Sequence, residues 1–335
     1  MARTDLMSRA QSGDGEAFRA LTEPHRRELQ VHCYRMLGSF QDAEDALQDT
    51  MLAAWRGLEH FDGRASLRTW LYRIATNRCL DALRAARRRP AKPWDIPGIE
   101  PPEPTSLGET PWIEPYPDAL LDGAISVPLG PEARYEQTES ISLAFVTALQ
   151  VLPPRQLAVL ILRDVLGFHA DETADMLDTT VDAVKSALKR ARAGMQRRLP
   201  STPREHPTGG NSYAEDTIVA KFVSAYESAD IDALVALLTD DVFLSMPPMP
   251  LEYRGRDIVA RFFALVFGSM RRYQLVPTRA NAQPAFGIYR HTPTGTHGSG
   301  LFALALTGGR ISAMIVFEDT VLPIFGLPQS LSSAQ

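Results

Sequence analysis

Cysteine is scarce in this sequence of 335 residues, which has only Cys33 and Cys79. Both lie in segments with helical periodicity, so a pair of small buried thiols is favoured over the alternatives, a regulatory disulfide or a metal-binding pair. This content excludes a small secreted scaffold held together by disulfides. His291 and His297 bracket a turn and have no second pair near them, so we expect neither a metal site nor a cofactor.

Long apolar runs are also missing. No stretch of about eighteen uninterrupted apolar residues occurs, which argues against a membrane-spanning helix. The first eighteen residues contain no apolar core of a secretion signal, so we expect a cytoplasmic protein without membrane contacts. Apolar residues make up 44% and charged residues 22% of the chain, a composition typical of two or three globular domains.

Positive charge is not in excess, because 40 acidic residues outnumber 35 lysines and arginines and give a net charge of −5. A free-standing nucleic-acid-binding protein usually has the opposite balance. The distribution is uneven, however. Residues 61–90 contain eight arginines and two aspartates, residues 91–139 contain ten acidic and two basic residues, and residues 181–198 contain six basic residues and one aspartate. Two basic segments therefore flank an acidic one.

Periodicity and composition divide the chain into five parts. These are a helical domain (5–90), an acidic proline-rich linker (91–137), a second helical domain (138–199), a short linker (200–211) and an α+β domain (212–327). In the first part we expect helix breaks near Pro24, at residues 38–39 and at residues 61–66. The longer linker contains Trp94, Trp112 and Tyr116, so we expect it to dock on another part rather than to float free.

The basic segment of the first part begins with a turn of small residues, 63–66, and continues as a helix with one apolar face. Its arginine-rich end, together with the aromatic Phe61 before the turn, suits contacts with phosphates and exposed bases. In the preceding helical segment, Asp42, Asp45 and Asp49 share one face. An acidic face beside a DNA-binding helix favours a basic protein partner; the alternative is an ordinary solvated face.

The second basic segment has the pattern of a helix-turn-helix. Gly167 permits a turn, residues 171–177 form a short helix with the small Ala174, and residues 178–180 form the tight turn, with Thr180 as candidate N-cap. The second helix of the motif packs its apolar residues inward and turns its basic residues outward. This arrangement is typical of a helix whose N-terminal half enters the major groove of DNA.

In these motifs and their order the chain resembles the extracytoplasmic-function (ECF) sigma factors of the sigma-70 family, which are dissociable RNA polymerase subunits that confer promoter recognition. The motifs are GSFQDAEDALQDTMLAAWR, then FDGRASLRTWLYRIATNRCLDALR, and after the linker LPPRQLAVLILRDVLGFHADETADMLDTTVDAVKSALKRAR. The resemblance implies two partners, promoter DNA and the polymerase core with its largest-subunit clamp and flap regions. It also explains the acidic total, because the polymerase supplies most of the DNA-binding surface.

The resemblance assigns roles to particular residues. Core-polymerase contacts are implied for Asp42, Asp45, Gln48 and Asp49. Contacts with the minus-ten promoter element are implied for Phe61, Arg64, Ser66, Asn77, Arg78 and Arg84, with Phe61 and Asn77 lining the pocket of a flipped base. Contacts with the minus-thirty-five element are implied for Thr180, Lys185, Ser186, Lys189, Arg190 and Arg192.

The last part, with the motif YRGRDIVARFF, resembles a SnoaL-like domain of the NTF2-like superfamily. The implied fold class is multidomain: two all-α sigma domains, a helical bundle and a helix-turn-helix, followed by an α+β NTF2-like cone. Such fused chains resemble the SigG-type group of actinobacteria. A cavity for a small apolar ligand is expected among Tyr226, Met246, Tyr253, Phe262, Phe286, His291 and Phe302.

Three functions compete. The favoured one is a polymerase-dependent initiation factor, not an enzyme, with the SnoaL-like domain as a fused regulatory module. The second is a one-component helix-turn-helix regulator, which has no use for a strand-capturing segment such as residues 61–89. The third is a cyclase or isomerase with appended DNA-binding parts, for which Asp240, Asp241, His291 and Tyr226 would be the acid/base candidates.

Overall fold

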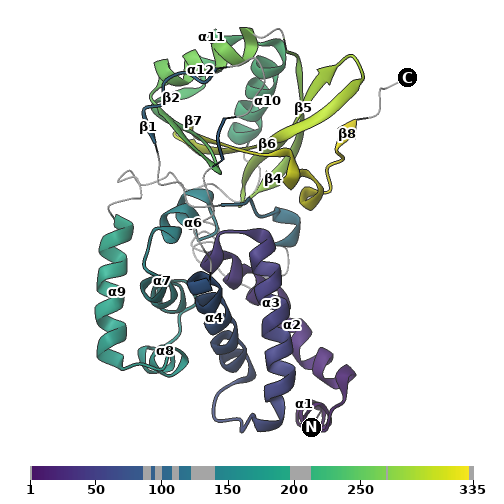
Figure 1. Cartoon of the computed structure of the whole chain (residues 1–335), viewed down its shortest axis with the longest axis vertical. Coiled ribbons are helices and arrows are strands. Elements are labelled where there is room, and N and C mark those ends of the chain that lie inside the picture. The colour runs from purple at the N-terminus through teal and green to yellow at the C-terminus, as the bar shows by residue number, and fades with distance from the viewer. Residues whose placement is uncertain are drawn as a thin grey trace. The chain divides into compact units, whose positions relative to one another are not determined.

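A computed structural model of the chain describes residues 2–85, 92–94, 100–107, 113–121, 140–196, 213–268 and 271–331. These residues form two compact units, one helical and one built on a sheet (Figure 1). Among the described residues, no helix has both the length and the apolar character needed to span a membrane.

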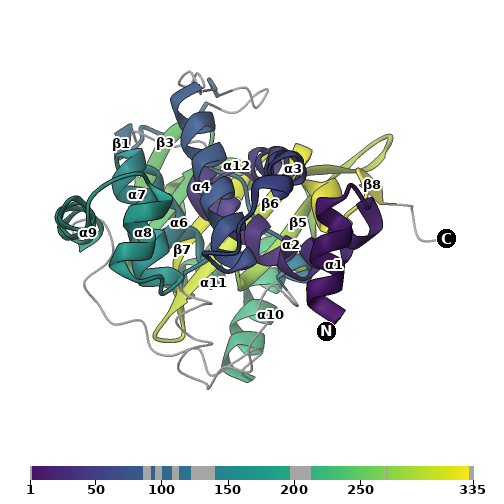
Figure 2. The ribbon, with the colours of Figure 1, turned by 90° about the horizontal axis from the view of Figure 1, so that it is seen from below.

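The helical unit has an N-terminal and a C-terminal group of helices. The N-terminal group comprises α1 (Ala2–Gln11), α2 (Gly15–Leu37), α3 (Phe40–Gly57), a 3-10 turn (Leu58–His60) and α4 (Leu67–Ala85). The C-terminal group comprises α6 (Leu143–Gln150), α7 (Pro154–Leu160), a π turn (Ile161–Val165), α8 (Ala170–Met176) and α9 (Val181–Gln196). In both Figure 1 and Figure 2, α7 and α8 lie beside α4, with which they are in contact.

Local sequence signals account for the ends of α2 and α3. The Asp14 carboxylate accepts bonds from the Glu16 and Ala17 amides and starts α2, and Gly38 ends it with a φ of 72°. Ser39 then caps α3 by accepting a bond from the amide of Asp42. The predicted break at Pro24 is wrong, because α2 continues through this residue while buried side chains on both sides of it hold the two halves in one bundle.

The two cysteines lie on α2 and α4, and both thiols are free and fully buried. A hydrogen bond with Cys33, together with burial, raises the pKa of the Cys79 thiol. The pair is therefore part of the packing between the two helices, as the helical periodicity predicted.

The second unit begins its sheet with a linker residue pair, β1 (Ser106–Leu107). The remaining elements are α10 (Tyr213–Ser228), α11 (Ile231–Ala236), β2 (Leu238–Met246), β3 (Met249–Arg254), α12 (Arg256–Gly268), β4 (Tyr273–Ala280), β5 (Gln283–Thr292), β6 (Gly295–Thr307), β7 (Arg310–Phe317), a 3-10 turn (Asp319–Phe325) and β8 (Ser330–Leu331). The strand order is β1-β3-β2-β7-β6-β5-β4, with β8 paired to β6. Only the β2–β7 pair of these is parallel.

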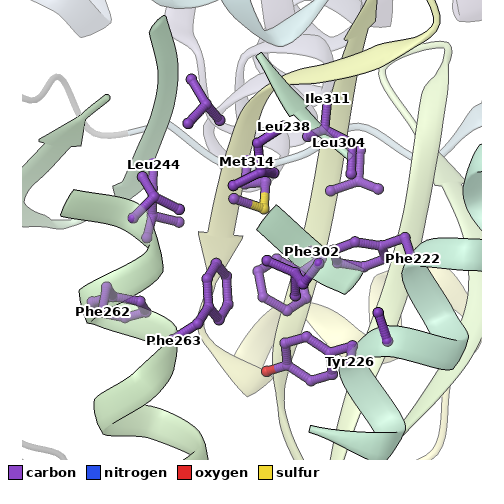
Figure 3. Packing of buried hydrophobic residues seen from close by; sticks show 14 of the residues in the cluster. Phe222, Tyr226, Leu238, Leu244, Phe262, Phe263, Phe302, Leu304, Ile311 and Met314 are labelled. Atoms are coloured by element: carbon purple, nitrogen blue, oxygen red, sulfur yellow. The ribbon is translucent and has the colours of Figure 1, made fainter. Parts of the chain in front are cut away.

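The core of this unit lies between the sheet and helices α10 and α12 and contains both aromatic and aliphatic side chains (Figure 3). The Tyr226 ring lies 5.2 Å from the rings of both Phe302 and Phe267. Phe222 lies 5.9 Å from Phe302. The helices and the antiparallel strands thus form the helix-plus-sheet domain that was predicted to follow two helical ones.

Candidate protein and nucleic-acid interfaces

The exposed face of α3 carries the residues predicted to contact a protein partner. Asp45, Gln48 and Asp49 are exposed, and Asp42 is half-buried. Leu52 continues this face one turn later and leaves 47% of its side chain exposed. Leu52 was not predicted, although its helical spacing from Gln48 and Asp49 was a usable signal. The face therefore combines negative charge with an accessible apolar residue, which suits a protein rather than DNA.

The loop before α4 is held from both sides. The Gln11 side-chain amide donates to the carbonyl oxygens of Leu58 and Phe61 at 3.2 and 3.0 Å. The Phe61 ring, half-buried, packs against the ring of Trp70 at 5.0 Å. Arg64 is exposed and forms an ion pair with Asp62 at 2.5 Å. An aromatic ring is thus presented at a fixed place, with a cation close by in sequence.

Ser66 has a structural role that the sequence prediction did not include. Its hydroxyl oxygen accepts a bond from the Thr69 amide at 3.0 Å, at the start of α4. Beyond it, Asn77, Arg78 and Arg84 are all exposed. Arg73, one helical turn before Asn77, is exposed as well and belongs to the same surface. The structure therefore places the predicted DNA-binding residues of this helix on its accessible side, around Asn77.

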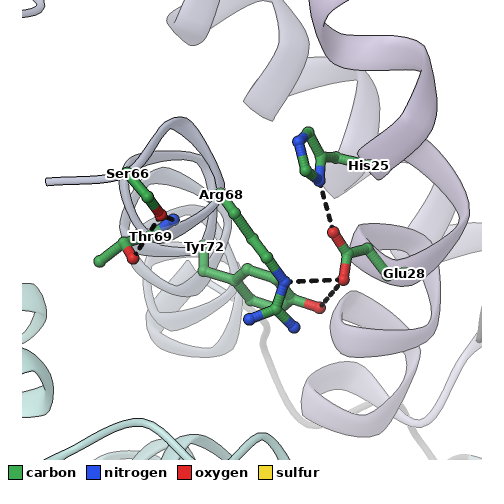
Figure 4. Close-up of polar contacts among 6 residues, drawn as sticks. All are labelled: His25, Glu28, Ser66, Arg68, Thr69 and Tyr72. Carbon is green, nitrogen blue, oxygen red and sulfur yellow. Dashed lines mark hydrogen bonds and ion pairs between the residues drawn. The ribbon is translucent and has the colours of Figure 1, made fainter. Parts of the chain in front are cut away.

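Arg68 takes no part in that surface but joins α4 to α2 (Figure 4). Its Nε donates to Glu28 Oε2 at 3.0 Å, and the Tyr72 hydroxyl donates to the same oxygen at 3.2 Å. His25 Nδ1 lies 2.6 Å from Glu28 Oε1. Burial alone would favour the neutral carboxyl, but the His25 hydrogen bond and the Arg68 charge outweigh it, so the pKa of Glu28 lies below its ordinary value.

The same arginine contacts the segment between α7 and α8. Its guanidinium lies over the rings of Tyr72 and Phe168, at 4.7 and 5.3 Å from their centres. The two rings meet edge to face at 5.4 Å, and Phe168 is buried. These contacts connect the N-terminal helices to the helix-turn-helix through a cation and two aromatic rings.

The helix-turn-helix has the predicted cap, and its second helix α9 has the predicted buried and exposed faces. Thr180 Oγ1 accepts a bond from the Ala183 amide at 3.2 Å and so caps α9. Val184 and Leu188 are buried, and the predicted outward-facing residues Lys185, Ser186, Lys189 and Arg190 are exposed. Arg192 differs, because its guanidinium makes two bonds of 2.8 Å to the Asp164 carboxylate in the π turn. Among the predicted DNA contacts of α9, Arg192 is therefore already engaged within the protein.

The predicted cavity residues of the second unit, with one exception, lie in the aromatic core. Tyr226, Met246, Tyr253, Phe262, Phe286 and Phe302 are buried in a single cluster. Burial raises the pKa of the Tyr226 hydroxyl. His291 is the exception: the structure corrects its placement, because it is exposed on the β5–β6 hairpin and lies 2.9 Å from Thr296 Oγ1. A hairpin that projects from a sheet cannot turn this side chain into the core.

The other acid/base candidates lie outside the core as well. Asp240 has 93% of its side chain exposed and pairs with Arg256 at 2.6 Å. Asp241 is exposed. The polar candidates thus do not converge on Tyr226. Within the described ranges, no three His, Cys, Asp or Glu side chains group as metal ligands would.

The described linker residues up to Asp118 dock on the sheet unit, as was predicted from the aromatic residues of the linker; of these, Trp112 lies outside the described residues. Its strand β1 pairs with β3, so that Ser106 lies opposite Glu252. The Tyr253 hydroxyl donates to the Pro102 carbonyl oxygen at 3.2 Å. Trp94 meets Phe262 edge to face at 6.2 Å, and Lys92 pairs with Glu318 at 2.7 Å. Main-chain pairing, a ring contact and ion pairing therefore all contribute to this interface.

Comparison with known families and proteins agrees with these features. Residues 21–89 match the model of sigma-70 region 2, residues 142–195 match sigma-70 region 4, and residues 219–319 match a SnoaL-like domain. The chain is 43% identical over 328 residues to the ECF RNA polymerase sigma factor SigG of Mycobacterium tuberculosis, covering 94% of this chain and 85% of that protein. It is 26% identical to SigW of Bacillus subtilis, covering 58% and 94%.

Among solved structures, that of the M. tuberculosis sigma factor SigJ is similar in fold. Its TM-score is 0.60 with 22% sequence identity, covering 93% of this chain and 99% of that one.

Proposed function

The chain belongs to the ECF RNA polymerase sigma factors, and from this premise we propose how its surfaces divide the work of transcription initiation. The exposed face of α3, with Asp45, Gln48 and Asp49, binds the clamp of the polymerase largest subunit, and the helix-turn-helix approaches the flap. The loop at Phe61 and the surface of α4 around Asn77 capture the melted minus-ten element. On α9, the exposed residues Lys185, Ser186, Lys189 and Arg190 read the minus-thirty-five element. Because core polymerase works in the cytoplasm, we place the protein there.

The observation that carries this proposal is the sorting of side chains on α3, α4 and α9. Each helix buries one apolar face and exposes a face on which one sign of charge prevails, negative beside Leu52 on α3 and positive on α4 and α9. Opposite charges steer different partners to different surfaces. A one-component regulator would need α9 but would not need the surface of α4.

Run-off transcription with purified core polymerase tests the assignment. We expect transcript from the full chain with core polymerase and none from the chain alone. Reversing the charge of Asp45 and Asp49 together to lysine should weaken core binding by on the order of tenfold or more. Reversal of the exposed Glu23 on α2 is the matched control and should leave binding unchanged. Tight promoter binding by the chain alone, without association with core polymerase, would contradict the proposal.

We also propose that the SnoaL-like domain regulates rather than catalyses. Its acid/base candidates Asp240 and His291 are exposed and lie outside the core, whereas its surface holds the linker that joins the two sigma regions. A linker bound to this domain is withheld from the polymerase channel, for which its length and negative charge suit it. The domain therefore restrains initiation until the linker is released.

Two tyrosines of the domain offer a matched test of this restraint. Tyr253→Phe removes the hydroxyl that donates to Pro102 in the linker, and Tyr289→Phe removes one that donates to Pro328 at 2.7 Å near the C-terminus. We expect more run-off transcript from the first variant and an unchanged yield from the second. An equal yield from both variants and the unchanged chain would refute the restraint, and loss of transcription with Asp240→Asn would favour catalysis.

A further inference from the structure

The turn between β4 and β5 has an unusual backbone. Asn281 and Ala282 have φ values of 56° and 60°, in the left-handed region that favours glycine. Asparagine tolerates this region better than most residues, but alanine does not. A two-residue connection between antiparallel strands favours positive φ at both of its residues, so the hairpin itself accounts for this conformation. The contacts at this turn are with the linker.

Asn281 is fully buried and binds two segments far apart in sequence, the linker at Tyr116 and the chain just after the linker at Ile141. Its backbone amide donates to the Tyr116 carbonyl oxygen at 2.8 Å, and its side-chain Oδ1 accepts from the Tyr116 amide at 2.7 Å. Its Nδ2 donates to the Ile141 carbonyl oxygen at 2.7 Å. Asn281 thus binds the main chain of Tyr116 as a neighbouring strand would. Its side chain also holds the main chain at Ile141, just after the linker.

The next residues of the linker are recognised by charge. The Asp118 carboxylate accepts a bond from the Ala282 amide at 2.7 Å and one from Arg279 Nε at 3.1 Å. Arg279 is itself held by an ion pair of 2.7 Å to Glu215 on α10. Between these anchors, Pro117 forms a bridge with Ala280. The guanidinium is therefore held by its own domain as well as by the aspartate.

The linker segment also buries two apolar side chains. Tyr116 is fully buried, and Ile113, three residues earlier, is 5% exposed. The segment therefore buries an aromatic and an aliphatic side chain while its main chain and its aspartate are bound. Main-chain contact at an edge strand together with a counter-charge is a recurrent mode of peptide recognition.

We propose that Arg279, Asn281, Ala282 and Glu215 form a peptide-binding site, the Asn281 site, which recognises an extended acidic segment with the sequence Tyr-Pro-Asp. In this structure the linker of the same chain occupies the site. A separate peptide with the same sequence binds there when the linker is absent from it. The binding itself does not depend on the proposed function; only the effect of such a peptide on transcription rests on it.

Fluorescence anisotropy tests the site on the full chain. The probe is a fluorescein-labelled peptide of residues 113–121, and the protein carries Tyr116→Ala and Asp118→Ala so that its own linker no longer fills the site. We expect saturable binding, at least about tenfold weaker to the unchanged chain, whose linker competes at a high effective concentration. A peptide with Asp118→Ala should bind on the order of tenfold more weakly.

Two glycine substitutions separate recognition from backbone strain. Asn281→Gly keeps the left-handed turn, since glycine adopts it freely, but deletes the side-chain amide. It should weaken peptide binding by on the order of tenfold. Ala282→Gly relieves the same kind of strain and removes no hydrogen-bonding group, so it should bind as the parent does. Equal affinity of the two variants, or no saturable binding by the parent, would overturn the proposal.

Hydrogen exchange on the chain with its natural linker distinguishes loss of the linker contact from a failure of the variant to fold. The Tyr116 amide should be protected in the unchanged chain and in Ala282→Gly, and should exchange at least about tenfold faster in Asn281→Gly. Equal protection in both variants would refute the site. Finally, excess peptide added to the unchanged chain with core polymerase should raise run-off transcription. Binding without this rise would refute the proposed restraint and leave the Asn281 site standing.

Discussion

The helical unit should lose stability in mild acid because of one residue, His32. This side chain is fully buried on α2. Its Nε2 lies 2.9 Å from Thr76 Oγ1, and the Thr76 hydroxyl already donates its proton to the Tyr72 carbonyl oxygen at 2.7 Å. Nε2 must therefore carry the hydrogen, and Nδ1 has none. Among the described residues Nδ1 has no hydrogen-bond partner, so a second proton would create a buried charge without an acceptor.

The size of the effect follows from linkage between protonation and folding. Burial, with the positive charges of Arg35 and Arg68, lowers the pKa of His32 from 6.5 to about 3. Between these values the unfolded chain binds a proton that the folded chain does not, so stability falls as the pH falls. The loss of folding free energy is small above pH 6.5, grows as the pH falls, and is complete below about pH 3. At pH 5 it amounts to about 2 kcal/mol.

Hydrogen exchange of the α2 amides, corrected for the intrinsic effect of pH, measures this loss for the helical unit alone. His32→Gln retains a donor for Thr76 but cannot titrate, and His60→Gln removes an exposed histidine as the control. Between pH 7.5 and pH 5, the parent and the control should each lose about 2 kcal/mol more than His32→Gln. If the three proteins lose the same free energy within about 0.5 kcal/mol, the reasoning is refuted.

Three other substitutions have expected outcomes. Phe168→Ala should destabilise the helix-turn-helix by about 3 kcal/mol, measured by exchange of the α8 amides, because it removes a buried ring; an effect below about 1 kcal/mol would contradict this. Gly300→Ala should lower the free energy of unfolding of the sheet unit by roughly 2 kcal/mol or more, since a Cβ there would lie 2.4 Å from the Phe317 carbonyl oxygen. Gly268→Ala, with nothing within 4 Å, is its control in the same denaturation experiment. Arg192→Ala should cost less than about 1 kcal/mol, because its ion pair is largely exposed, and should leave promoter selectivity unchanged in run-off assays.

The faces that depend on helical spacing were readable from the sequence. The acidic face of α3 and the basic face of α9 depend on residues three and four positions apart, and local hydrogen bonds fix such relations. Thr180 was identifiable as a cap for the same reason. Where a second segment decides the outcome, sequence reasoning failed. Arg68 was one of the eight arginines of the basic segment and received no predicted role, whereas in the structure Glu28 and Phe168, both distant in sequence, bind it.

The misplacement of His291 has a related cause. Strand periodicity indicates which residues share a face of β5. It does not indicate how far the β5–β6 hairpin extends past the core, because that depends on the length of the strands paired with it. The β5–β6 hairpin continues to Thr292 and Gly295, so His291 lies near its exposed end. Pro24 shows the opposite error, because a local breaking signal was overruled by burial on both sides of it.

The prolines that identified the linker also explain how it is recognised in one register. Pro115 and Pro117 flank Tyr116, and proline has no amide hydrogen to donate. Within this triplet only Tyr116 has an amide that can donate to Oδ1 of the buried Asn281, and it does so at 2.7 Å. A shift by one residue would leave that oxygen unsatisfied and would also separate Asp118 from Arg279. The prolines that predict an extended linker therefore have two effects at the sheet. They keep the segment extended, and they leave a single amide donor for the main-chain contact.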